Sequence, residues 1–242
     1  MAASTATNPV TRLGGLALIV GVILSVLASL IFPGGVMDPV DQTDFSAALE
    51  AAAANASLAH LASMLSIMGM FLYGYAAFTW LRLAEEGPGG LCLRLGACVS
   101  VFGWSLYVVA MGMRQFSVHL MQRGMEPGAD QAMFETLALN TYVSMAGIVI
   151  ALVSVYPIGS ILVGIGLSSR FGSVSVFKLA SYGFVLVGVL AVINFLVLQH
   201  VSGIEPLVLL TNDNGLQAFG SLFLIIIGLG MYRGRAELTS EA

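Results

Sequence analysis

Long apolar runs separated by short polar segments dominate the chain. Six of these runs approach or exceed the roughly 20 residues that a helix needs to cross about 30 Å of hydrocarbon. The runs cover residues 10–32, 58–81, 91–113, 137–167, 176–198 and 216–231. The period-two alternation of a transmembrane strand is missing, and a helix satisfies its own backbone polar groups in lipid. The sequence therefore predicts an all-α polytopic membrane protein, with residues 1–242 forming a single six-helix transmembrane domain.

The basic residues are distributed unevenly between the two ends of these predicted helices. Seven gather at one end, namely Arg12, Arg82, Arg94, Arg170, Lys178, Arg233 and Arg235. The opposite end has only Arg114 and Arg123, and its three loops are acidic. Because Lys and Arg are retained on the cytoplasmic side, this pattern predicts that both termini are cytoplasmic. In a bacterium the protein would then lie in the inner membrane as a multi-pass protein.

A weak internal repeat follows the same distribution. Each odd-numbered helix opens with a basic residue, a leucine and a small residue, at positions 12–14, 94–96 and 178–180. Each even-numbered helix ends near a basic residue. We expect three consecutive helical hairpins, although the charge rule alone would also place a basic residue at each of these ends.

Several segments between the apolar runs have helical signals of their own. Asp44, Asp130 and Asp213 each precede an even-numbered helix and are N-cap candidates. We expect the second and fourth helices to extend above the membrane or to lie along it. The third helix should continue to about His119, because no Gly or Pro interrupts it after residue 113. Pro157 predicts a bend in the fourth helix, which is either structural or, in a transporter, part of a substrate site.

Composition narrows the possible functions. The chain is 58% hydrophobic and 9% charged, whereas a soluble domain has about 25% charged residues. It has no basic face for nucleic acid, and the motifs of nucleophilic, zinc-dependent or nucleotide-binding enzymes are missing. No Asp or Glu falls inside any of the six predicted spans. Ion-coupled transporters usually need such groups, so the pattern argues against both an enzyme and a secondary transporter.

The strongest candidate site lies where the third apolar run ends. Gln115, His119 and Arg123 are spaced four residues apart and share one helix face, with Arg114 beside them. The two arginines could bind an anionic lipid headgroup or a carboxylate of a partner by forked hydrogen bonds. The alternative is local pairing with the acidic residues of the next loop, Glu126, Asp130 and Glu135.

A second candidate site is a metal centre. The three histidines all fall near the same ends of helices. The donors of the metal centre would be His60, Met64, His119 and His200. Imidazole with thioether suits copper, and histidine also binds haem. The structural alternative is that methionine fills helix interfaces and that histidines near helix ends bond backbone carbonyls. The sequence implies no cofactor beyond this copper or haem possibility.

The two ends of the chain also resemble a known family. These are the opening Arg-Leu-Gly-Gly-Leu-Ala-Leu (12–18), Leu-Gln-Ala-Phe (216–219) and Ile-Gly-Leu-Gly-Met-Tyr-Arg-Gly (227–234). With the length and the six helices, they resemble bacterial six-helix membrane proteins known only as a domain of unknown function. The resemblance implies a six-helix fold, and it implies no activity and no functional residue.

The sequence thus predicts a non-catalytic inner-membrane protein that acts by binding, as a subunit of a larger membrane complex. Its expected partners are membrane lipids and other membrane protein subunits. Two alternatives stay open, namely a metal- or haem-binding redox protein that uses the outer histidines and a small-solute transporter or channel.

Overall fold

The computed structural model describes residues 9–239, which are helical and contain no strand. The helices are α1 (Pro9–Ile31), α2 (Phe45–Ala54), α3 (Ala56–Leu83), α4 (Pro88–Gly124), α5 (Gln131–Ser168), α6 (Val176–His200) and α7 (Pro206–Tyr232), followed by the short 3-10 helix η1 (Ala236–Leu238). All except α2 and η1 are long and apolar enough to cross a membrane. This finding confirms the prediction of six helices that are long and apolar enough to span a membrane.

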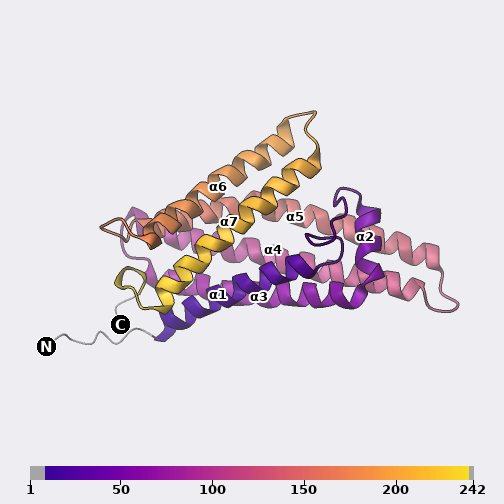
Figure 1. Cartoon of the computed structure of the whole chain (residues 1–242), viewed down its shortest axis with the longest axis horizontal. Helices are drawn as coiled ribbons and strands as arrows, with labels where there is room; N and C mark the ends of the chain where they lie inside the picture. The colour runs from indigo at the N-terminus through magenta and orange to yellow at the C-terminus, as the bar shows by residue number, and fades with distance from the viewer. Residues whose placement is uncertain (1–8, 240–242) are drawn as a thin grey trace.

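The six long helices form a closed ring. Each packs against the next in the chain, in the order α1, α3, α4, α5, α6 and α7, and α7 packs against α1. Figure 1 shows α7 crossing α1 at the end of the bundle that holds both chain termini, here called the terminal end. At the opposite end, here called the α2 end, α6 and α7 diverge from the other helices.

The main hydrophobic core lies toward the terminal end and receives side chains from all six long helices. Trp80 and Phe184 are the largest fully buried side chains in it. Glycines allow the helices to approach closely, as in many membrane proteins. A Cβ atom on Gly166 of α5 would lie 2.7 Å from the backbone nitrogen of Leu93 in α4. A Cβ on Gly15 of α1 would lie 2.5 Å from the carbonyl oxygen of Gly228 in α7.

Smaller clusters hold the α2 end together without α6 and α7. Ala48 and Leu49 of α2 pack with Met111 of α4 and Tyr142 of α5. Figure 1 shows α2 crossing the long direction of the bundle, and the helix breaks at Asn55 before α3 begins. The core therefore divides into a six-helix part at the terminal end and a part at the α2 end built on α1 to α5.

Two of the three predicted N-caps are confirmed. Asp44 accepts hydrogen bonds from the backbone of Ser46 and Ala47, and Asp130 accepts one from Met133. The third prediction, an N-cap at Asp213, is wrong, because Asp213 lies inside the helix. The last helix begins ten residues earlier than the apolar run suggested, because Pro206 suits the first helical position.

The third and fourth membrane-capable helices are the longest. Helix α4 has 37 residues and continues past His119, as predicted. Helix α5 has 38 residues and stays helical through the buried Pro157. At 1.5 Å per residue, both are about 55 Å long, against about 30 Å of hydrocarbon. Their hairpin therefore extends well beyond the thickness of a bilayer core.

Candidate functional site

Arg114 is the buried charge at the α2 end of the bundle. Its side chain lies on the same face of α4 as the buried residues Met111 and Val118, three and four positions away. Only 8% of Arg114 is exposed. Its Nε donates a hydrogen bond to Ser63 Oγ of α3 at 2.9 Å, and its guanidinium carbon lies 4.0 Å from the centre of the Phe32 ring. The arginine thus joins α3, α4 and the end of α1.

No carboxylate neutralises Arg114 within the described part of the chain. The expected pairing with the acidic loop does occur for Arg123, whose Nε lies 3.5 Å from Glu126 Oε2. Arg114 forms no such ion pair with a described Asp or Glu, because its position on the buried face turns it away from that loop. Its only side-chain hydrogen bond to a described residue is the one to Ser63. A guanidinium has five N–H donors, so most of its hydrogen-bonding capacity stays unused by those residues.

The predicted stripe of Gln115, His119 and Arg123 lies on a different face of α4 from Arg114. Gln115 is half-buried, whereas His119 and Arg123 are exposed. The four residues of the predicted site therefore separate into one interior cation and three residues at the surface. Phe116, which is 54% exposed, lies on this outer face between Gly112 and His119.

The structure places His60 beside α4 and His200 at the end of α6. His60 Nε2 of α3 lies 3.4 Å from Gln122 Oε1 of α4. His200 ends α6, which packs against α5 and α7, and Figure 1 shows this end of α6 apart from α3 and α4. The expected metal centre would need His200 beside His60 and His119, whereas the end of α6 lies apart from α3 and α4. Met64 is exposed, and residues 9–239 contain no group of three or more His, Cys, Asp or Glu side chains that could hold a metal ion.

Asp213 is the charged residue that the sequence pattern missed. It lies within α7, and only 6% of it is exposed. Gln217 Nε2 donates to its Oδ2 at 2.7 Å. Its Oδ1 has no hydrogen-bond partner among the described residues. The predicted span 216–231 contains no acidic residue, but the helix that could cross the membrane is longer, from Leu207 to Tyr232, and it includes Asp213.

The sequence does contain a signal that Asp213 lies within a helix. The polar run 212–214 favoured a loop at this position instead. Asp213 and Gln217 are four residues apart, a spacing that stacks side chains on one helix face. Apolar residues also precede the run at 207–210. Near Asp213, Asn194 of α6 donates from Nδ2 to the carbonyl oxygen of Leu209 at 2.9 Å. The side chain of Asn194 thus joins α6 to α7 in the half of the bundle where the two helices diverge from the rest.

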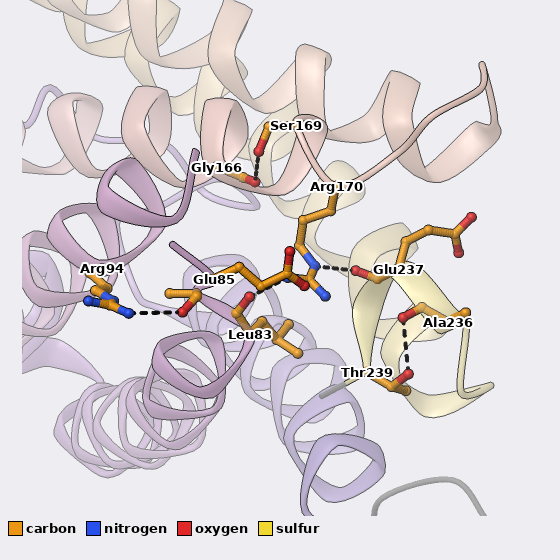
Figure 2. Close-up of polar contacts among 10 residues, drawn as sticks. Leu83, Glu85, Arg94, Gly166, Ser169, Arg170, Ala236, Glu237 and Thr239 are labelled. Atoms are coloured by element: carbon orange, nitrogen blue, oxygen red, sulfur yellow. Dashed lines mark hydrogen bonds and ion pairs between the residues drawn. The ribbon is translucent and has the colours of Figure 1, made fainter. Parts of the chain in front are cut away.

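At the terminal end the basic residues bond backbone carbonyls. Figure 2 shows Arg170 at the centre of these contacts, where it donates to the carbonyl oxygens of Leu83 and Glu237 and pairs with Glu85 at 2.7 Å. Arg94 donates to the carbonyl oxygen of Ala84 at 3.1 Å. These arginines satisfy carbonyls at the ends of helices. A small pocket lies beside Arg170, between the α3–α4 turn and the end of α5. The guanidinium of Arg170 in its wall already bonds groups of this chain.

Comparisons of the chain with protein-family models, with curated proteins and with solved structures found no match. The resemblance to six-helix proteins of unknown function therefore stays a prediction. The class that the fold defines is a multi-pass helical membrane protein. Within that class, the distinguishing features are the buried Arg114, the buried Asp213 and the long α4–α5 hairpin.

Proposed function

We propose that this protein is a non-catalytic integral membrane protein that acts by binding, as a subunit of a larger membrane complex. The observation that supports the proposal is the long α4–α5 hairpin. A hydrocarbon span of about 20 residues that starts at Leu91 ends near Met111, and α4 continues to Gly124. The last three turns or more of α4 and the facing turns of α5 would then project from the bilayer core.

The projecting part of the hairpin carries exposed apolar side chains. Phe116 and Met125 are 54% and 68% exposed, and Met133 and Leu137 of α5 are 47% and 46% exposed. Within the hydrocarbon such residues face lipid, but beyond it they face headgroups or water. Exposed apolar side chains outside a membrane favour an interaction site. We define Gln115, Phe116, His119, Arg123 and Met133 as the hairpin surface, and it is the proposed contact with a partner subunit.

The proposed orientation places the hairpin surface on the outer side of a bacterial inner membrane. Seven basic residues lie at the terminal end and two at the α2 end, which favours cytoplasmic termini. Three consecutive hairpins, α1–α3, α4–α5 and α6–α7, are consistent with the packing of neighbouring helices. In this arrangement the acidic loop residues, including Glu126, would lie beside the hairpin surface.

Native gel electrophoresis of the protein in a mild detergent tests the complex. We expect the protein to migrate well above the mass of its 25.3 kDa chain, and Phe116→Ala combined with Met133→Ala to shift it toward the free chain. A matched control is Phe102→Ala combined with Leu186→Ala, which removes exposed apolar side chains from parts of α4 and α6 placed in the hydrocarbon. Migration of the native protein as a free chain in several mild detergents would refute the proposal.

Small-solute transport is the second candidate function, and Asp213 favours it. Buried ionisable groups in membrane-spanning helices often mark ion or substrate paths. The residues around Asp213 do not define a substrate. The metal or haem alternative has no comparable observation in its favour, since residues 9–239 contain no group of three or more His, Cys, Asp or Glu side chains that could hold a metal ion.

A further inference from the structure

Asp213 presents an unpaired carboxylate oxygen inside the bundle. The residue lies seven positions after the start of α7 at Pro206, about 10 Å into the helix at 1.5 Å per residue. Its Oδ2 accepts the hydrogen bond from Gln217, and its Oδ1 has no partner in the described chain. An ionised carboxylate without a counter-charge is very unfavourable in hydrocarbon. The group therefore needs a positive partner, or a proton.

The elements that pack on α7 supply no positive partner within the described residues. Arg12 of α1 donates to the carbonyl oxygen of Tyr232, 19 residues along α7 from Asp213 and about 28 Å away. Lys178 of α6 binds the carbonyl oxygen of Phe171 near the terminal end. His200 is exposed at the other end of α6. None of these side chains forms an ion pair with Asp213.

The groups that do face Asp213 are neutral. The hydroxyl oxygen of Tyr156 in α5 lies near Gly220 of α7, where an added Cβ atom would be 3.0 Å away. Gly220 is seven residues after Asp213, with Gln217 between them, so all three share one face of α7. A proton requires only one oxygen, whereas Ca²⁺ or Mg²⁺ requires about six ligands. The surroundings therefore favour a proton over a metal ion.

We propose that Asp213 is a proton-binding site that exchanges its proton with the aqueous phase at the α2 end. Divergence of α6 and α7 from the other helices occurs at that end (Figure 1), and α7 begins there. On protonation, one carboxylate oxygen becomes a hydroxyl and the charge of the side chain is neutralised. The amide of Gln217 remains a hydrogen-bond donor to the other oxygen. No further reactant is needed, because the proton comes from water and returns to it.

Infrared difference spectroscopy of the full-length protein in lipid vesicles, between acidic and alkaline pH, tests the site. We expect the C=O band of a protonated carboxyl in apolar surroundings to appear on acidification of the native protein and to be lost in Asp213→Asn. Asparagine keeps the size of the side chain and can still accept from Gln217, but it cannot bind the proton. The matched control is Asp38→Asn in the exposed loop before α2, which should keep the band.

A second variant tests the site without changing the carboxyl group. Gln217→Leu removes the hydrogen bond to Oδ2, so the band should remain and change its frequency. An unchanged frequency in Gln217→Leu, or the same difference spectrum in Asp213→Asn as in the native protein, would overturn the proposal. Loss of the band on addition of Na⁺ at constant pH would overturn it in favour of a sodium site.

This inference is independent of the complex-subunit proposal. Failure of the infrared test would remove the observation that favours transport, and it would leave the native-gel result unaffected. Conversely, a protein that migrates as a free chain could still show the Asp213 band.

Discussion

At the scale of single residues, burial separates charges that the sequence places side by side. Arg114 and Gln115 are adjacent, yet Arg114 faces Ser63 and Phe32 in the interior while Gln115 lies toward the surface. A step of one residue turns a helix by about 100°, which is enough to move a side chain from the buried face to the exposed one. The chemistry available to each residue is therefore set by its face and not by its neighbours in the chain.

Ser63→Ala should lower the free energy of unfolding by about 1–3 kcal/mol, because it removes the acceptor of a buried, charged donor. Ser63 Oγ accepts from Arg114 and itself donates to the carbonyl oxygen of Ala59. The matched control is Ser105→Ala in α4, whose exposed hydroxyl also donates to a carbonyl oxygen one turn back, and it should change stability by less than about 0.5 kcal/mol. Thermal unfolding in detergent measures both, and equal effects would show that the Arg114 contact contributes nothing.

At the scale of the elements, close helix contacts depend on glycine at particular positions. Gly96 and Gly166 lie where α4 and α5 approach each other, and each added Cβ would meet the backbone of the other helix within 3 Å. Gly147, also in α5, has no atom within 4 Å of the same position. The sequence shows 28 glycines without distinguishing these two situations, since both occur within apolar runs.

Gly166→Ala should therefore destabilise the protein by about 1–3 kcal/mol, because the added methyl group meets the backbone of Leu93, which cannot turn away as a side chain can. Gly147→Ala is the matched control in the same helix. It should be neutral or stabilise by up to about 1 kcal/mol, since alanine is the better helix former. Midpoints of thermal unfolding would compare the two variants, and a similar loss in both would contradict the α4–α5 contact.

At the scale of the whole molecule, the two ends of the bundle differ. The terminal end closes the ring, with Leu238 fully buried in the core and Arg170 bound to the backbone of α3 and η1. At the α2 end, α6 and α7 diverge from the other helices (Figure 1). Both proposed sites, the hairpin surface and Asp213, lie in the half toward the α2 end.

Cysteine accessibility in intact cells tests which end faces outward. Single cysteines at Asp41, Glu126 and Glu205, in a chain lacking Cys92 and Cys98, should react with a membrane-impermeant thiol reagent. The expectation follows from the retention of basic residues in the cytoplasm.

Cysteines at Glu86 and Gly172 are the controls for this experiment, and they should react only after the membrane is permeabilised. Labelling of those two positions in intact cells would reverse the orientation. It would also place the hairpin surface on the cytoplasmic side.

The sequence alone was sufficient to predict the number of helices that could span a membrane, the continuation of α4 to His119 and the caps at Asp44 and Asp130. These features are local, because hydrophobic length, helix-breaking residues and capping side chains act within a few turns. For the candidate site, the sequence predicted the segment from Arg114 to Arg123 but not which of its side chains are buried. Which of its residues are buried depends on contacts with α1 and α3, which are distant in the chain.

Tertiary structure alone decided the position of Asp213, the separation of His200 from the other histidines and the interior location of Arg114. A polar run such as 212–214 predicts a loop by composition, but α7 includes it with Asp213 buried and Asn212 and Asn214 exposed. The divergence of α6 and α7 from the other helices likewise has no local signature, since it depends on contacts between helices that are distant in the chain. Charge placement along the chain is thus a local property, whereas the burial of each charge is a property of the whole fold.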